Sequence, residues 1–305
     1  MSIRLSSFFL NQIFIIALAL HAGQAAFAAP STDVSRSDDY SLMVRVEAGG
    51  FKRGSLFDET KEYLELCRKW DNACELWWFE DEFPQKQITL DSYWIDMYEV
   101  TNTQYLEFVK ATGHRPALDD SCLTEKCREG NLWEGNSFPP SIRNQPVVQV
   151  SWYDADTYCR WRNKRLPSEA EWEKAARGSI GNIYPWGSAS PKGRATFQRK
   201  WQGVFTMTDV GSYPQGASIY GVFDMAGNVW EWVDDWYHFK YYSLGRKKNP
   251  HGPATGEFKG VRGGAWVNYP NALRSAFRRW SRPEVRFNDT GFRCAKDAVD
   301  ETEKN

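Results

Sequence analysis

Asp224-Met225-Ala226-Gly227-Asn228-Val229-Trp230-Glu231-Trp232 is the stretch of this 305-residue sequence that decides its fold. The two tryptophans favour burial, because each indole carries a large apolar surface. Glu231 lies between them, and a carboxylate in apolar surroundings needs a partner if it is to stay ionised. The stretch therefore predicts a buried polar centre in which Glu231 faces either an arginine or a hard cation.

The composition predicts a loop-rich fold whose core is built from aromatic rings. The chain contains 15 Trp, 23 Gly and 14 Pro, and its formal net charge is -1. A charge so close to zero gives no general attraction to nucleic acid or to membranes. The composition does not change between residues 88 and 297, and the length suits one large domain or two small ones. We therefore expect a single domain over residues 42–297.

Residues 1–28 are typical of a secretory signal peptide. Arg4 supplies the positive charge, residues 8–20 are mostly apolar, and Ala26-Phe27-Ala28 is a small-x-small cleavage site. The apolar run contains Asn11-Gln12 and is shorter than the roughly 20 residues of a spanning helix. We expect a periplasmic protein that does not insert into the membrane after cleavage.

The mature chain is then expected to begin with a flexible segment over residues 29–41. A flexible tail is expected over residues 298–305.

Export makes disulfides the expected state of the six cysteines. Proximity pairs Cys67 with Cys74 and Cys122 with Cys127, which leaves Cys159 for Cys294. Six cysteines allow many other connectivities, so the sequence by itself leaves the pairing open. Zinc is disfavoured because the chain has no Cys-x-x-Cys spacing.

Three segments carry the start signals of helices. Thr101 with Gln104, Ser151 with Asp154, and Ser168 with Glu171 each form a capping box, which satisfies two backbone N–H groups at the helix start. The predicted helices run over 101–113, 151–163 and 168–178. Strands are predicted over 43–54, with a turn or hairpin at Gly49-Gly50, and over 88–98. Residues 56–87 look like an insertion.

Several motifs occur together in a fixed order. They are Glu99-Val100-Thr101-Asn102, Val150-Ser151-Trp152-Tyr153-Asp154-Ala155, Lys164 to Glu173 (KRLPSEAEWE), Tyr184-Pro185-Trp186-Gly187, residues 224–232, Arg262-Gly263-Gly264-Ala265-Trp266 and Gly291-Phe292-Arg293-Cys294. In this order they resemble the formylglycine-generating enzyme (sulfatase-modifying factor) family over nearly the whole mature chain. The resemblance implies one α+β domain, related to C-type lectins and low in regular secondary structure.

The resemblance also implies a structural calcium held by Asp224, Gly227, Val229 and Glu231. Calcium accepts backbone carbonyls beside carboxylates, so a loop that turns at Gly227 suits it. The alternative is that Glu231 pairs with an arginine and that no metal binds. A second family calcium site would lie beside Arg199-Lys200, where two cations would repel the ion, so we expect one site. The resemblance further implies a disulfide between Cys159 and Cys294.

The copper-dependent enzymes of this family use two cysteines after the Arg/Lys-Gly-Gly motif, because soft thiolates suit Cu(I). Asn268 and Leu273 stand at those positions here. Copper is therefore not expected, no catalytic residue is assigned, and formylglycine-generating activity is not expected. Iron is not expected either, because His114, His238 and His251 have no ligand spacing.

An arginine series follows Arg262. Guanidinium groups stack on aromatic rings and bind carboxylates bidentately, so internal pairing is expected for Arg262, Arg274 and Arg293. Arg279, Arg282 and Arg286 lie outside the family motifs and are candidates for a partner contact.

The sequence therefore favours a catalytically silent, calcium-stabilised periplasmic accessory protein. The resemblance implies a regulatory role in the activation of a threonine-phosphorylation pathway that controls type VI secretion. Its expected partner is a receptor-kinase ectodomain or an envelope lipoprotein. The alternative is a periplasmic oxidative maturation enzyme of the pyoverdine siderophore type.

Overall fold

The three capping boxes form the three helices that the sequence predicts. A computed structural model describes residues 42–119 and 130–298, which belong to one compact unit. Its helices α2 (Asn102–Thr112), α4 (Trp152–Trp161) and α5 (Glu169–Arg177) follow Thr101, Ser151 and Ser168, and each cap side chain accepts a backbone N–H bond three residues on. α2 and α5 end at Gly113 and Gly178, both with positive φ, a conformation that glycine adopts without a steric penalty.

Helix α1 (Phe57–Arg68) was not predicted, and it lies in the segment that the sequence marks as an insertion. Its N-cap position is Leu56, which offers no polar cap, so the start signal that identifies the other helices is missing. The remaining helical elements are α6 (Tyr241–Leu244) and the 3₁₀ turns η1 (Leu76–Glu82), η2 (Pro140–Ile142), η3 (Gly203–Phe205), η4 (Pro214–Gly216) and η5 (Pro270–Leu273).

The strands form three small sheets. The first contains β1 (Met43–Val46), β4 (Tyr93–Asp96) and β9 (Ala295–Asp297) in the order β1-β4-β9; the second pairs β2 (Gly49–Arg53) with β3 (Lys86–Leu90). The third contains β5 (Trp230–Trp236), β6 (Lys259–Arg262), β7 (Arg279–Ser281) and β8 (Thr290–Phe292) in the order β7-β6-β5-β8. β5 and β8 run parallel, and every other pair is antiparallel.

Both predicted strand regions form strands, but each divides into two. β1 and β2 do not form a hairpin with each other, because β1 pairs with β4 and β2 pairs with β3. The alternating sequence pattern indicates extended backbone and gives no information about the partner strand. The division at Gly49 was therefore decided by tertiary pairing.

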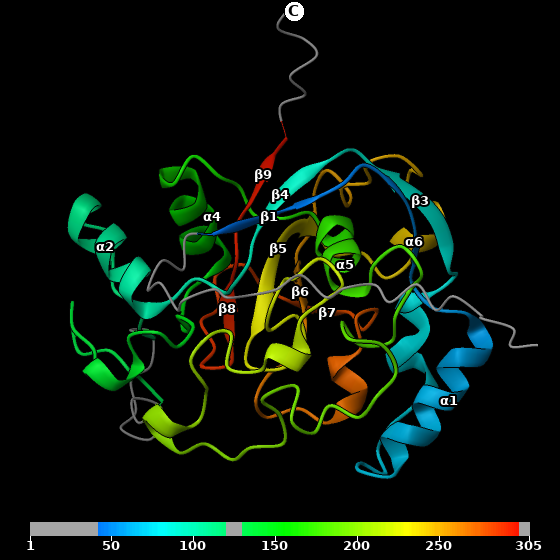
Figure 1. Cartoon of the computed structure of the whole chain (residues 1–305), viewed down its shortest axis with the longest axis horizontal. Coiled ribbons are helices and arrows are strands. Elements are labelled where there is room, and N and C mark those ends of the chain that lie inside the picture. The colour runs from blue at the N-terminus through cyan, green and yellow to red at the C-terminus, as the bar shows by residue number, and fades with distance from the viewer. Residues whose placement is uncertain (1–41, 120–129, 299–305) are drawn as a thin grey trace, which may run out of the picture. The chain divides into compact units, whose positions relative to one another are not determined.

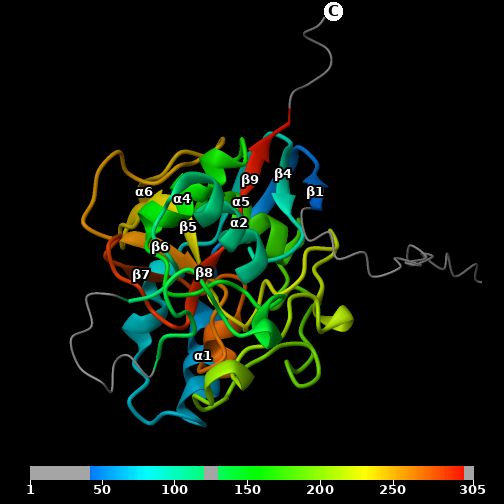
Figure 2. The same ribbon diagram turned by 90° about the vertical axis from the view of Figure 1, so that its left-hand side faces the viewer.

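The four-stranded sheet lies at the centre, and helices pack on it (Figure 1). α4 and α5 both contact β5, and α5 also contacts β2 and β6. The second view shows β5, β6, β7 and β8 close to one another, with α2 and α4 on the viewer's side (Figure 2). Trp172, Trp230 and Trp232 are among the largest fully buried side chains, so the core is aromatic as the composition predicts. The α+β class and the low content of regular structure are confirmed.

Two of the expected disulfides are present. Cys159 of α4 is bonded to Cys294, which follows β8, and Cys67 of α1 is bonded to Cys74. The third expected pair, Cys122 with Cys127, lies outside the described residues. In the part of the chain that the structure describes, no helix is long and apolar enough to cross a membrane.

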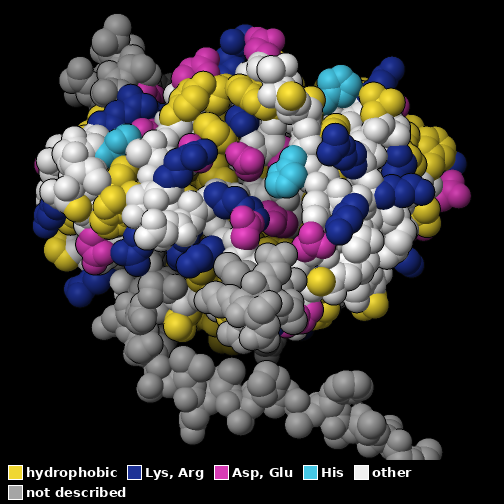
Figure 3. Space-filling view, turned by 90° about the horizontal axis from the view of Figure 1, so that it is seen from above, with side chains coloured by type: hydrophobic (Ala, Val, Ile, Leu, Met, Phe, Trp, Pro, Cys, Tyr) yellow, Lys and Arg dark blue, Asp and Glu magenta, His cyan; other side chains and the backbone are white. Residues whose placement is uncertain are grey.

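Positive and negative side chains are interspersed on the face above β9 and β4 (Figure 3). Arg165 belongs to this region and pairs with both Glu171 and Asp297. The mixed surface agrees with the near-neutral net charge of the chain.

Candidate functional site

The loop that leads into β5 has an unusual backbone. Asp224, Gly227 and Asn228 have φ values of 57°, 82° and 62°. A Cβ atom on Gly227 would lie 2.4 Å from the carbonyl oxygen of Thr196, so glycine is required there. The loop delivers Trp230, Glu231 and Trp232 into β5.

Glu231 is fully buried and is paired with Arg293. Arg293 Nε lies 2.6 Å from Glu231 Oε2, and Arg293 Nη2 lies 2.7 Å from Glu231 Oε1. Trp172 Nε1 donates a third hydrogen bond, of 2.8 Å, to Glu231 Oε2. This bidentate geometry is the strong form of a charge-assisted pair. Glu231 therefore pairs with an arginine, which is one of the two partners that the sequence left open.

The remaining donors of Arg293 are also satisfied. Its Nη1 donates to the carbonyl oxygens of Asp96 and Met97, and its Nη2 donates to that of Phe223. The guanidinium thus connects β5 to β4 and to the loop before Asp224. We call Glu231, Arg293 and Trp172 the buried centre.

Two more carboxylates lie near the buried centre. Glu99 accepts hydrogen bonds from Asn228 Nδ2 and from the backbone N–H of Val229, and Asp224 accepts one from the backbone N–H of Gly211. Burial raises the pKa of Glu99 well above its usual range, with further contributions from Asp224 and Glu231. Burial likewise raises the pKa of Asp224 to about 6. Three carboxyl groups therefore share one guanidinium, and either a proton on Glu99 or a bound cation offsets the charge that Arg293 does not neutralise.

This cluster of carboxyl groups is compatible with a calcium ion, but the side chains do not form a complete ligand set. Both oxygens of Glu231 already accept hydrogen bonds from Arg293. Among the described residues, no group of three or more His, Cys, Asp and Glu side chains is arranged to hold a metal. A calcium ion would need the backbone carbonyls of Gly227 and Val229 together with Asp224 and Glu231, as hard oxygen ligands allow.

Asn268 and Leu273, where the resemblance implies cysteines in copper-dependent relatives, both have structural roles here. Asn268 Oδ1 accepts a hydrogen bond of 2.9 Å from the backbone N–H of Ala265, which fixes the turn after the Arg-Gly-Gly motif. Leu273 is fully buried in an apolar cluster with Tyr184 and Ala226. Every cysteine within the described ranges is in a disulfide.

The arginine series mostly serves buried ion pairs, as expected for Arg262, Arg274 and Arg293. Arg262 contacts Glu169 and Glu173, and Arg274 forms a bidentate pair with Glu82. Arg278 forms a bidentate pair with Glu169.

The three candidate partner arginines do not share one environment. Arg286 is buried, pairs with Asp154 and donates to the carbonyl oxygen of Leu118, so its assignment to a partner surface was wrong. Arg282 is exposed beside Glu257. Arg279 is partly exposed and lies over the ring of Trp230.

The histidines show no shared site in the described residues. His114 Nε2 lies 2.8 Å from Asp154 Oδ1 and belongs to the Asp154 network. His238 and His251 lie near α6, where the ring of His238 accepts from the backbone N–H of Lys240 and the carbonyl of His251 accepts from Tyr241.

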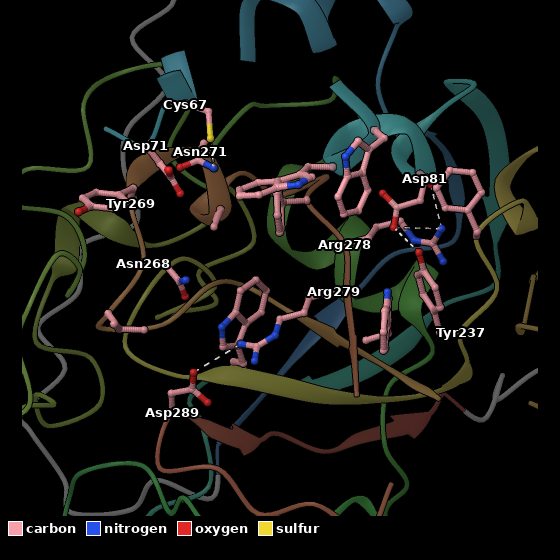
Figure 4. A pocket seen from close by; sticks show the side chains of 18 of the residues that line it. Cys67, Asp71, Asp81, Tyr237, Asn268, Tyr269, Asn271, Arg278, Arg279 and Asp289 are labelled. Atoms are coloured by element: carbon pink, nitrogen blue, oxygen red, sulfur yellow. Dashed lines mark hydrogen bonds and ion pairs between the residues drawn. The ribbon is translucent and has the colours of Figure 1, made fainter. Parts of the chain in front are cut away.

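A cleft of about 850 Å³ opens beside Asn268 (Figure 4). One wall comes from the segment after α1, the other from β7 and the loops around it. Aromatic rings dominate both walls; they include Trp77, Trp78, Tyr237, Phe258, Tyr269 and Trp280. We call this the aromatic cleft.

The aromatic cleft also contains unsatisfied polar atoms. Asp81 Oδ2 accepts a hydrogen bond of 2.7 Å from the Tyr237 hydroxyl, while the buried Oδ1 has no partner. Trp230 Nε1 also lacks a partner, although Trp230 is 1% exposed. Burial raises the pKa of Asp81 to about 7, against the lowering effect of Arg278.

Sequence reasoning did not find this cleft. The sequence signal for the cleft is Leu76-Trp77-Trp78-Phe79, in which two indoles stand side by side in a charged segment. Neighbouring side chains point in different directions, so both indoles are not expected to enter the core. Trp77 is 62% exposed.

The chain belongs to the sulfatase-modifying factor enzyme 1-like domain family, whose model matches residues 28–298. The family resemblance is thereby confirmed.

Two curated relatives illustrate its range. The chain is 35% identical over 268 residues to the serine/threonine-protein kinase pkn1 of Chlamydia pneumoniae, covering 84% of this chain and 38% of that protein. It thus spans less than half of the chlamydial kinase. It is 33% identical over 324 residues to the formylglycine-generating enzyme of Streptomyces coelicolor, covering 92% of this chain and 97% of the enzyme.

Among solved structures, the fold is similar to PvdO from Pseudomonas aeruginosa. The TM-score is 0.63 at 28% sequence identity, and the match covers 84% of this chain and 94% of PvdO.

Proposed function

We propose that this protein is a catalytically silent, exported accessory protein that regulates a partner by binding. The observation that carries the proposal is the state of the two copper-cysteine positions. Asn268 fixes a turn and Leu273 fills a core cluster. Neither side chain is a ligand for Cu(I), which prefers thiolates. The neighbouring cleft nevertheless remains open, which supports binding without oxidation.

A protein kinase is the partner class that we favour. A relative named as a serine/threonine-protein kinase contains a region 35% identical to this chain. A domain that is part of a kinase chain in one organism can act on a separate kinase chain in another organism. We therefore propose that the protein resembles TagR in promoting a threonine-phosphorylation pathway that controls type VI secretion, through a receptor-kinase ectodomain or an envelope lipoprotein in the periplasm.

A structural calcium is part of this proposal. The crowding of Glu99, Asp224 and Glu231 around the single guanidinium of Arg293 supports it, because a bound cation would let Glu99 ionise there. Asp224, Glu231 and the carbonyls of Gly227 and Val229 would hold the ion, and the ion would neutralise the loop without taking part in chemistry.

The partner proposal is tested with purified proteins. The mature chain is titrated against the ectodomain of a threonine receptor kinase by calorimetry, and phosphorylation by the full-length kinase is followed in vesicles. Arg282→Ala removes an exposed guanidinium, and Lys61→Ala on α1 is the matched exposed control. Binding that raises phosphorylation supports regulation. Oxidation of a cysteine peptide by the copper-loaded protein would contradict the silent assignment.

A second function is favoured by the likeness to PvdO. We propose as the alternative an oxidative maturation enzyme of the pyoverdine siderophore type, with the substrate in the aromatic cleft and Asp81 as acid or base. Turnover of a siderophore precursor by the wild-type chain, and its loss in Asp81→Asn, would support this alternative over the accessory role.

A further inference from the structure

The aromatic cleft has features that neither the buried centre nor a kinase partner explains. Its walls come from different parts of the chain: Trp77 belongs to η1 and Trp280 to β7. We propose that the cleft binds a glycan chain of flat pyranose rings with equatorial substituents. This inference does not depend on the proposed partner.

The apolar part of the site consists of partly exposed aromatic rings, and one face of Tyr269 stacks on Trp70. Trp77 is 62% exposed, Trp280 is 46% exposed and Tyr269 is 41% exposed. The face of an aromatic ring is electronegative, and it attracts groups with partial positive charge. The axial C–H groups of an equatorially substituted sugar ring form such a flat surface, so a sugar ring stacks on an indole.

The polar part of the site consists of one acceptor and one donor. Asp81 Oδ1 can accept a hydrogen bond and Trp230 Nε1 can donate one, and both are buried without partners. Buried polar atoms are otherwise nearly always bonded. A sugar hydroxyl both donates and accepts, and an N-acetyl group provides an N–H and a carbonyl. Asp81 and Trp230 both line the cleft, so a glycan that displaces the side chains covering these atoms can serve both, whereas a purely apolar ligand would leave both unpaired.

The charge of the cleft favours a neutral ligand. Arg278 is held by a bidentate pair with Glu169, and Arg279 pairs with Asp289 at 3.4 Å (Figure 4). These guanidinium groups therefore already have carboxylate partners and do not form a free anion site.

The lining also distinguishes a glycan from a peptide. The aliphatic side chains in the lining are Val267 and Ala272, which offer little to the branched apolar residues of a docking peptide. Planar polar groups are present instead, including those of Asn268 and Asn271. A volume of about 850 Å³ is near the upper end of the usual range for ligand sites, roughly 300–1,000 Å³. The cleft therefore has room for more than one ring.

The test uses the full mature chain and soluble β-1,4-linked N-acetylglucosamine oligomers of one to four rings. Binding is measured by calorimetry and by the change in tryptophan fluorescence. We expect affinity to increase with oligomer length. Trp77→Ala and Trp280→Ala should each weaken binding at least tenfold. Trp94→Ala is the matched control, because Trp94 is a partly exposed indole on β4 outside the cleft.

Conservative variants test the two unpaired atoms. Trp230→Phe keeps a ring and removes the donor, and Asp81→Asn keeps the shape and replaces one acceptor oxygen with an NH2 donor. Each should weaken binding about tenfold while the melting temperature and near-UV spectrum show that the fold is retained.

Two results would overturn the proposal. One is the absence of binding by any oligomer at millimolar concentration. The other is oligomer binding that Trp77→Ala and Trp280→Ala leave unchanged. If arrayed peptides bind in a Trp77-dependent manner and the oligomers do not, the ligand class is wrong and the cleft is a peptide site.

Discussion

The buried centre and the aromatic cleft are built from the same types of side chain, and their polar atoms are in opposite states. In the buried centre, both oxygens of Glu231 are bonded to Arg293. In the cleft, Asp81 Oδ1 and Trp230 Nε1 have no partner. The comparison teaches that tryptophans with carboxylates and arginines do not by themselves mark a functional site. Unsatisfied hydrogen-bonding groups in residues that line an open cleft mark a candidate binding site, whereas the fully bonded pair of Glu231 and Arg293 marks a structural one.

The largest effect is expected from breaking the buried centre. Arg293→Met should destabilise the protein by about 3–5 kcal/mol, because it leaves Glu231 buried without its partner. Denaturant unfolding measures this loss. The double variant Glu231→Leu with Arg293→Met should recover part of it, because it removes both charges.

The control for this prediction is Arg282→Met, which removes the exposed pair with Glu257. Its cost should be about 0–1 kcal/mol, as for other surface pairs. If Arg293→Met lowers the free energy of unfolding by as little as Arg282→Met does, the buried centre is not the structural core that the contacts indicate.

The two disulfides allow the stability of the buried centre and of the aromatic cleft to be compared by removing one bond beside each. Cys159–Cys294 adjoins the buried centre and closes a sequence separation of 135 residues, whereas Cys67–Cys74 adjoins the cleft and closes one of 7. Chain entropy gives an upper value of about 5 kcal/mol for the long loop and about 2 kcal/mol for the short loop. Replacing each pair by serines and measuring unfolding should reproduce this order. The reverse order would show that strain or residual unfolded structure outweighs loop length.

The pH dependence of stability should reveal Asp81. Its folded pKa is raised to about 7 from a usual 3.8, so the folded state binds a proton more tightly than the unfolded state. This contribution is fully present below about pH 4 and is lost as the pH rises through about 7, on the order of 4 kcal/mol in total. Asp81→Asn should flatten that part of the stability curve.

Asp58→Asn is the comparison, because Asp58 is exposed on α1. This variant should leave the slope of the stability curve between pH 4 and 7 unchanged. If Asp81→Asn also leaves the pH 4–7 slope of the stability curve equal to that of the wild type, Asp81 is solvated by the open cleft.

Calcium is expected to stabilise the buried centre and not the cleft. At a concentration one hundred times its Kd, an ion that binds only the folded state adds about 2.7 kcal/mol. The melting temperature should therefore fall on chelation, and it should fall less in Asp224→Ala. Equal melting temperatures with calcium and with chelator would remove the metal from the proposal and leave Arg293 as the sufficient partner of Glu231.

Much of the local structure could be predicted from the sequence. The boxes at Thr101, Ser151 and Ser168 identified three helices because a cap and its reciprocal side chain lie three residues apart. Helix α1 was missed because Leu56 gives no such signal. Arg286 was misassigned because nothing close in the sequence shows that Asp154 lies beside it.

The sequence by itself determined the family, the capped helices, the aromatic core and the presence of Asn268 and Leu273 where the resemblance implies cysteines, since these depend on residue type and short spacing. Only the tertiary structure decided that Arg293 neutralises Glu231 from 62 positions away, and that Asp81 and Trp230 meet in one cleft. Hydrogen bonding and burial are properties of spatial neighbours. They can be known only once distant segments have packed together.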